Sequence, residues 1–257
     1  MDVATVKAIS VIFPAYNEQT NILKTVETAQ RVLRQIVPKW EIIVVNDGSH
    51  DDTGRICDDL MARYADVSVV SHPTNRGYGA ALRSGILAAR HDLIFFSDSD
   101  GQFDLNEISR LLAHIDQHDV VVGYRAKRQD PIHRKINAWG WKMLVRTMLG
   151  VRVRDIDCAF KLFRKEVFHR IQVRAIGAMV NTEILCQATG FGMRIKEVPV
   201  SHFPRYHGQP TGANIRVVLR AFRELFKLWT KLRYLAHDQR GLYSTPESER
   251  HPALPQS

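Results

Sequence analysis

Short apolar runs alternate with longer segments of helical periodicity along the first half of the chain. The apolar runs lie at 8–13, 41–45, 67–71, 92–96 and 119–122. The intervening segments 21–36, 51–64, 79–90 and 104–115 repeat apolar residues every three or four positions, with Ile22, Val26, Ala29 and Leu33 on one face of the first. This alternation is typical of βαβ units. It predicts an α/β protein with a Rossmann-like, mostly parallel sheet flanked by helices.

The second half of the chain is less regular. Segments 131–150 and 181–189 are predicted to be helical, and 193–198 is predicted to be a strand. Two prolines and two glycines within 202–212 indicate a mobile loop. We expect one α/β domain at 1–212, an amphipathic helix at 213–236 and a disordered tail at 237–257, where prolines recur.

Polar clusters follow three of the predicted strands, at 14–18, 46–49 and 97–102. Ligands of open α/β sheets bind at the carboxyl ends of the strands. Acidic side chains can face a nucleoside diphosphate only across a cation, and Asp98 and Asp100, two positions apart, suit Mg²⁺ or Mn²⁺ shared with phosphate oxygens. The clusters therefore predict a metal site at which the cation neutralises charge on a departing diphosphate.

The formal net charge of +9 and the pI near 9.6 favour a polyanionic partner. No known nucleic-acid-binding module is present, and the first strand leads into 14–18 without a GxGxxG motif, which argues against a dinucleotide oxidoreductase. Cys57, Cys158 and Cys186 are odd in number and share no CxxC spacing. A disulfide framework or zinc site is therefore not expected, and a reducing cytoplasm fits best.

Two basic, amphipathic segments indicate where the positive charge acts. No run reaches the roughly 18 to 20 apolar residues that span a bilayer, and the amino-terminal residues lack the order of a secretion signal. Segment 214–235 places Arg216, Arg220, Arg223, Lys227 and Lys231 opposite an apolar face, and 131–150 combines Trp139 and Trp141 with Arg134, Lys135, Lys142 and Arg146. Each could pack on the domain. Together they predict peripheral binding to the cytoplasmic face of a membrane.

Several segments carry a family resemblance. VIFPAYNE, VVNDGSHDDT, NRGYGAALRSG and FFSDSDGQFDLNEI resemble family 2 glycosyltransferases of the GT-A fold. VVGYR, RDIDCAFKLFRKEVF and EVPVSHFPR are similar to the polyprenyl-phosphate sugar transferases, the dolichol-phosphate mannose synthase group. The likeness runs from about residue 10 to 225. It implies an inverting, Mg²⁺- or Mn²⁺-dependent hexosyltransferase that moves sugar from GDP-mannose, UDP-glucose or UDP-N-acetylglucosamine to polyprenyl or dolichyl phosphate.

The resemblance also implies roles for single residues. The donor site would comprise Pro14, Tyr16, Glu18, Val45, Asp47, Asp98, Ser99, Asp100, Gln102, Arg125 and Arg205, with Asp98, Asp100 and Gln102 on the metal. The residues implied in catalysis are Asp100, Arg125, Arg134, Asp155 and Glu183. Arg134 would meet the acceptor phosphate, and Arg205 would close over the donor diphosphate. Thr211 stands where mannose synthases often carry lysine, which leaves the sugar open.

Two alternative functions remain open at this point. A lipid phosphate is already ionised and needs little help from a general base, whereas a saccharide hydroxyl does. A family 2 transferase with a saccharide acceptor would therefore require Glu183 or Asp155 as the base. The second alternative is a nucleotide-binding membrane scaffold that retains the fold without turnover.

Overall fold

The computed structural model describes residues 8–126 and 146–204 and the single positions 140, 143, 226 and 230. All described strands lie in a compact unit, Met1–Thr211; of a second unit, Gly212–Ser257, only Phe226 and Thr230 are described, and both are helical. Positions 140, 143 and 146–149 are helical, as expected. Gly150, the last residue of the predicted helix, is described and is not helical. The other residues of 131–145, most of the segment 213–236 and the whole tail 237–257 lie outside the described residues.

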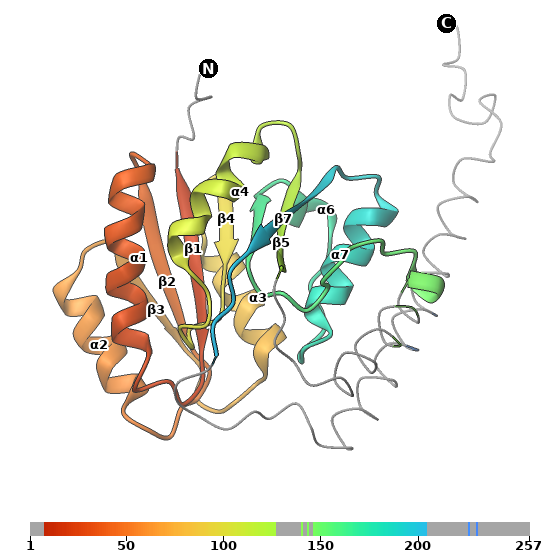
Figure 1. The fold of residues 1–257 in the computed structure, drawn as a ribbon. Coiled ribbons are helices and arrows are strands. Elements are labelled where there is room, and N and C mark those ends of the chain that lie inside the picture. Colours follow the sequence, from red (N-terminus) through yellow and green to blue (C-terminus); the bar gives the residue numbers. More distant parts are fainter. Residues whose placement is uncertain are drawn as a thin grey trace, which may run out of the picture. The chain divides into compact units, whose positions relative to one another are not determined.

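The described strands form one seven-stranded sheet in the order β3-β2-β1-β4-β6-β5-β7 (Figure 1). The strands are β1 (Ile9–Ala15), β2 (Trp40–Asn46), β3 (Val67–Ser71), β4 (Leu93–Phe96), β5 (Val120–Arg125), β6 (Lys161–Arg164) and β7 (Ile195–Val200). The helices are α1 (Ile22–Ile36), α2 (Thr53–Arg63), α3 (Tyr78–Ala88), the 3₁₀ turn η1 (Leu105–Glu107), α4 (Ile108–Ile115), α6 (Val167–Arg170) and α7 (Val180–Gly190). None of the described helices is long and apolar enough to span a membrane.

The sheet is mostly parallel, as predicted, with β6 as its exception. Strand β6 pairs antiparallel with both β4 and β5, and the other pairings are parallel. The sequence pattern did not predict β6 or α6. Each has four residues, and β6 begins with a lysine and ends with an arginine, so neither is long enough to show a period. The carboxyl ends of β1, β2, β4, β5 and β7 consequently meet at one edge.

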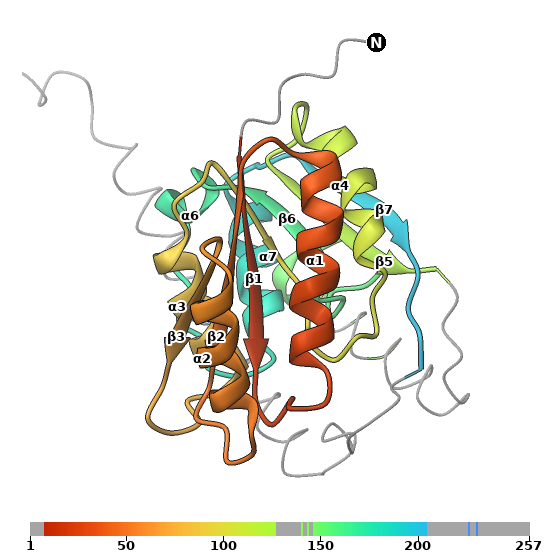
Figure 2. The same ribbon diagram turned by 90° about the vertical axis from the view of Figure 1, so that its left-hand side faces the viewer.

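Helices cover both faces of the sheet (Figures 1 and 2). Helices α1, α2 and α4 share one hydrophobic cluster with that face of the sheet, and the predicted apolar stripe of α1 is fully buried. On the other face, a Cβ at Gly85 of α3 would lie 2.4 Å from Ile12 Cγ2, so only glycine permits this approach of helix to strand. Phe163 of β6 packs on the same face, between Phe96 and Phe168 of α6.

Candidate functional site

The acidic loop, residues 97–102, follows β4 at the edge where the parallel strands end. Ser99 is buried: its hydroxyl donates to the Pro14 carbonyl at 2.8 Å, and its own carbonyl accepts from the Thr25 hydroxyl at 3.0 Å. Ser99 thereby ties the loop to β1 and α1. Asp98 and Asp100, on either side of it, remain partly exposed. The local fold thus directs the serine inward and leaves two carboxyl groups at the sheet edge.

The electrostatics of Asp98 favour a bound cation. Burial and the neighbouring Asp100 raise the pKa of Asp98 to about 6, although Tyr78, Lys161 and Arg125 act in the opposite direction. Either a proton or a metal ion would relieve this cost. Among the residues that the structure describes, no three His, Cys, Asp or Glu side chains form a metal cage. The two carboxylates of Asp98 and Asp100 suit Mg²⁺ or Mn²⁺, because such an ion binds through one or two carboxylates and completes its coordination shell with phosphate and water oxygens.

Gln102, the third predicted metal ligand, is connected to another part of the chain. Its side-chain Nε2 donates to the carbonyl of Phe203 at 2.9 Å, and its backbone N–H donates to Asp100 Oδ1 at 3.1 Å. The amide group therefore links the acidic loop to the segment after β7. Arg205, predicted to act from that segment, lies outside the described residues, as does Arg134.

The loops after β1 and β2 are joined to each other. Tyr16 is 41% exposed, and its ring meets that of His50 edge-on with centroids 6.3 Å apart. The His50 backbone N–H donates to Asn17 Oδ1 at 2.9 Å, and Ser49 Oγ accepts from the Asn17 backbone at 3.0 Å. Glu18 is buried, and its carboxylate accepts from the Asn21 side chain. An exposed aromatic pair at the strand ends can stack on a nucleobase.

Val45 and Asp47, the residues predicted at the nucleobase, are both buried. The Asp47 carboxylate lies 2.6 Å from His72 Nδ1 and accepts the backbone N–H groups of Arg76 at 2.9 Å and Gly77 at 2.8 Å. These bonds hold the loop before α3 at the strand edge and bring exposed Arg76 beside the site. Sequence reasoning missed His72 and Arg76. The NRG portion of the NRGYGAALRSG segment was the signal available for Arg76.

Arg125, the last residue of β5, forms a close ion pair with Asp155. Its Nε and Nη2 donate to the two carboxylate oxygens at 2.6 and 2.8 Å, and the side chains are 17% and 7% exposed. Burial alone would lower the pKa of Arg125, but the hydrogen bonds and charge of Asp155 raise it above its ordinary value. Arg125 also influences the pKa of Asp98, so the pair lies within electrostatic reach of the acidic loop.

Two further buried side chains support the loops around this edge. Glu183 Oε2 accepts the backbone N–H groups of Arg174 at 2.7 Å and Ala175 at 2.8 Å. Lys161, which sequence reasoning did not select, is fully buried on β6 and donates to the carbonyls of Ile156 and Cys158 and to Asn181 Oδ1. Lys161 thus connects the loop of Asp155 to α7. The only sequence signal for its burial was its position within the apolar run FKLF.

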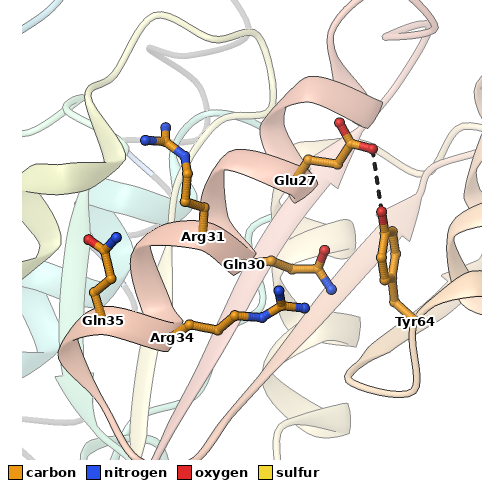
Figure 3. A pocket seen from close by; sticks show the side chains of 6 residues that line it. All are labelled: Glu27, Gln30, Arg31, Arg34, Gln35 and Tyr64. Carbon is orange, nitrogen blue, oxygen red and sulfur yellow. Dashed lines mark hydrogen bonds between the residues drawn. The ribbon is translucent and has the colours of Figure 1, made fainter.

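An open pocket elsewhere contains none of the predicted residues. It lies along α1 and is lined by Glu27, Gln30, Arg31, Arg34, Gln35 and Tyr64 (Figure 3). Arg34 and Gln35 belong to the last turn of α1, whereas Thr25, near the first turn, contacts the acidic loop. The described catalytic candidates therefore belong to the carboxyl edge of the sheet and not to this pocket.

Comparison with known proteins places the fold and the family. The structure resembles glucosyl-3-phosphoglycerate synthase from Mycobacterium tuberculosis in complex with UDP, with a TM-score of 0.68 and 20% identity over 87% of this chain and 80% of that one. The same enzyme with Mn²⁺ and UDP-glucose gives a TM-score of 0.64 and 22% identity over 85% and 79%. The seven-stranded mixed sheet with its flanking helices is therefore a GT-A fold.

The sequence relatives are sugar transferases named for polyprenyl phosphates. A dolichyl-phosphate β-glucosyltransferase of Trichomonas vaginalis is 32% identical over 75% of this chain and 64% of its own length. An undecaprenyl-phosphate 4-deoxy-4-formamido-L-arabinose transferase of Salmonella choleraesuis is 30% identical over 84% and 66%. The chain thus spans about two thirds of the length of these relatives. Residues 10–172, more than half of the chain, match the family described as Glycosyl transferase family 2. The chain belongs to glycosyl transferase family 2.

Proposed function

We propose that this protein transfers a sugar from a nucleotide-sugar to polyprenyl or dolichyl phosphate at a membrane surface, with inversion at the anomeric carbon. The observation that carries the proposal is the pair Asp98 and Asp100 at the sheet edge, where the pKa of Asp98 is raised to about 6 within reach of Arg125. The names of the two sequence relatives supply the acceptor class. GDP-mannose, UDP-glucose and UDP-N-acetylglucosamine are the candidate donors, and the dolichyl-phosphate β-glucosyltransferase relative makes UDP-glucose the first to test.

Asp98 and Asp100 would hold the Mg²⁺ or Mn²⁺ ion, with Gln102 beside them. When bound, the ion supplies charge neutralisation for the departing nucleoside diphosphate. Ser99 keeps the two carboxyl groups in place through its bond to Pro14. Tyr16 offers an exposed ring to the nucleobase. The chain's own contribution at the donor is thus a pre-arranged, partly buried acidic edge that needs little reorganisation when the donor binds.

The states of Asp155 and Glu183 favour a phosphate acceptor over a saccharide. A saccharide hydroxyl requires a carboxylate base, and these two residues are the candidates. Asp155 is held by two hydrogen bonds from the Arg125 side chain, and Glu183 Oε2 is held by two backbone N–H groups. Both carboxylates are therefore already engaged in holding protein groups, a supporting role that competes with service as a base. A lipid phosphate arrives ionised and needs none.

Positioning then replaces proton transfer as the main task of the protein. Asp155 fixes the guanidinium of Arg125, which is planar, permanently charged and suited to phosphate oxygens. Arg134 and Arg205 are assigned to the acceptor phosphate and the donor diphosphate on the sequence resemblance alone. Peripheral attachment to the cytoplasmic face of the membrane rests on the basic segments 131–150 and 213–236 and on the chemistry of a lipid acceptor.

A donor panel tests the proposal. Radiolabelled GDP-mannose, UDP-glucose and UDP-N-acetylglucosamine are each incubated with the full chain, Mn²⁺ or Mg²⁺ and a short polyprenyl phosphate, and lipid-soluble label is counted. We expect label from one donor, abolished by EDTA. Label transferred only to saccharide acceptors would favour the first alternative, and binding of a donor without transfer to any acceptor would favour the scaffold.

Two substitutions in the same stretch of chain sharpen this test. Asp100→Asn should remove most metal-dependent transfer. Asp104→Asn is the matched control, because the Asp104 carboxylate accepts hydrogen bonds from Asn106 at the start of η1 and Asp104 is not among the predicted site residues. Near-normal transfer by the Asp100 variant would refute the metal assignment.

A further inference from the structure

The chain that leaves β7 is fastened to the residues that follow the acidic loop. We call residues 201–204 the β7 extension. Glu107, at the end of η1, accepts the Ser201 backbone N–H at Oε2 with a distance of 2.6 Å and the Ser201 hydroxyl at Oε1 with a distance of 3.1 Å. Arg110 Nη1 donates to the same Oε1 at 2.7 Å. One carboxylate therefore fixes the point at which the chain departs from the sheet.

The next two residues of the extension continue the attachment toward the acidic loop. His202 forms an antiparallel bridge with Phe103, and their rings lie 5.0 Å apart. Phe203 donates its backbone N–H to the Gln102 carbonyl at 2.8 Å and accepts from Gln102 Nε2 at 2.9 Å. The Gln102 backbone N–H in turn reaches Asp100 at 3.1 Å. A continuous set of contacts therefore runs from Glu107 through the extension to a predicted metal ligand.

The environment of Glu107 makes this attachment strong. The side chain is only 8% exposed, and a carboxylate withdrawn from water is costly unless hydrogen bonds compensate it. Both oxygens accept donors, and hydrogen bonds to an ionised carboxylate are stronger than neutral ones. Phe103, the residue that follows Gln102 in the chain, packs on Phe160 with ring centroids 5.4 Å apart. Because Phe203 is hydrogen-bonded to both the backbone and the side chain of Gln102, movement of the β7 extension would displace Gln102.

A second carboxylate holds the other end of the same strand and provides a comparison. Asp119 Oδ2 accepts the backbone N–H of Arg194 at 2.8 Å, just before β7 begins. Both carboxylates thus hold β7 by a backbone amide. They differ in position, because Glu107 lies at the carboxyl edge with the acidic loop and Asp119 lies at the opposite edge, before β5.

We propose that Glu107 is a positioning residue for the donor half of the site: by holding Ser201 it keeps Phe203 on Gln102 and so fixes the acidic loop for a metal-bound nucleoside diphosphate. This inference rests on the proposed function for the identity of the ligand. It does not make Glu107 a ligand of either the metal or the nucleotide. Its effect passes through Ser201 and Phe203.

Calorimetric binding and hydrogen exchange test this on the full chain. Glu107→Gln should weaken the binding of GDP or UDP in the presence of Mn²⁺ by about tenfold, the scale of one charge-assisted hydrogen bond. It should raise the donor KM and leave the KM for polyprenyl phosphate unchanged. Amide exchange should become faster at Ser201, at Phe203 and at Gln102, whose N–H groups form the set of contacts.

Asp119→Asn is the matched control, because it loosens β7 at the opposite edge. It should speed exchange at Arg194 and leave nucleotide binding unchanged. Arg110→Ala, which removes a 56% exposed partner of Glu107, should also leave nucleotide binding unchanged. If the Asp119 and Glu107 variants, compared at equal loss of thermal stability, weaken nucleotide binding equally, Glu107 is merely structural and the proposal is overturned.

The outcomes separate this inference from the proposed function. If the wild-type protein binds nucleoside diphosphate with Mn²⁺ but transfers no sugar, the proposed function fails and the binding comparison still decides the role of Glu107. If exchange in Glu107→Gln becomes faster at Ser201 alone and stays unchanged at Phe203 and Gln102, the coupling is absent. That result overturns the inference even where sugar transfer is confirmed.

Discussion

Arg125 and Asp155 form the same three-bond arrangement as Arg194 and Asp119, but they form it inside the protein. In each pair the arginine donates its backbone N–H, Nε and Nη2 to one aspartate. The side chains are 17% and 7% exposed in the first pair and 60% and 28% in the second. An exposed ion pair contributes little, whereas removing one partner of a buried pair leaves an uncompensated charge.

Asp155→Asn should therefore cost about 3 kcal/mol in the free energy of unfolding, the lower end of the range for breaking a buried pair, as measured by urea denaturation. It should also lower turnover by about tenfold or more, because the Arg125 guanidinium would no longer be fixed toward the phosphates. Asp119→Asn, with the same bonds in an exposed setting, should cost clearly less and leave turnover unchanged. An Asp155 variant with unaltered stability and no turnover would instead indicate a direct chemical role, as the saccharide-acceptor alternative requires.

Metal affinity should depend on pH through Asp98, whose pKa is raised to about 6. A proton competes with the cation for the carboxylate, so Mn²⁺ affinity should be near its plateau at pH 7.5 and fall by about tenfold for each pH unit below about 6. Calorimetric titrations with Mn²⁺ and nucleoside diphosphate between pH 5 and 8, pH values chosen to bracket that pKa, would measure this. Affinity that stays constant across the range would contradict the assignment.

In the metal-free protein, by contrast, the folding stability should decrease as the pH rises. Because folding raises the pKa of Asp98 above its unfolded value, the protonated form stabilises the fold at low pH, and that contribution is lost as pH rises through about 6. Asp98→Asn should consequently raise the melting temperature of the metal-free protein near pH 7 and remove this part of its pH dependence. Thermal denaturation in EDTA at several pH values checks the sign, and a less stable variant at pH 7 would contradict it.

The sequence predicted the parts of the fold that have a clear period. Segment 67–71 coincides with β3, and the α1 stripe is buried as expected. Strand β6 was not predicted because four residues are too few to show a period, although β6 lies between β4 and β5 in the sheet and pairs with both. The strand-end position of the acidic loop was also predictable, since parallel strands end at one edge.

The partners of the buried carboxylates could not be predicted. Asp47 was predicted to bind the donor, and Asp155 and Glu183 were predicted to act in catalysis. Each is bonded to protein groups from another part of the chain: Asp47 to Arg76, Asp155 to Arg125, and Glu183 to Arg174. These contacts depend on how loops distant in the chain pack, which no local pattern encodes. The inward direction of Ser99 likewise depends on the carbonyl of Pro14, 85 residues away.

Glu183 provides a test between a support role and a base. Its two bonds to backbone N–H groups hold the loop at Arg174 and Ala175, so Glu183→Gln should cost about 1 to 2 kcal/mol in the free energy of unfolding. Turnover of the folded variant should stay within about threefold of wild type if the acceptor is a phosphate. Urea denaturation and steady-state kinetics at a temperature where the variant is folded measure the two effects. A loss of turnover of about 100-fold or more would favour Glu183 as a base.

Glycine at position 79 should be required because the loop held by Glu183 lies against the start of α3. A Cβ there would lie 2.0 Å from the Ala175 carbonyl oxygen, which is backbone and cannot rotate away. The Gly79 N–H also donates to the Ile176 carbonyl at 2.9 Å, so the loop and helix cannot separate without losing a hydrogen bond. Gly79→Ala should therefore cost about 3 kcal/mol by urea denaturation, the upper range of overpacking. Gly190→Ala, with open space around its Cβ in α7, should be neutral or gain up to about 1 kcal/mol. Equal stabilities of the two variants would mean that the loop does not press on α3.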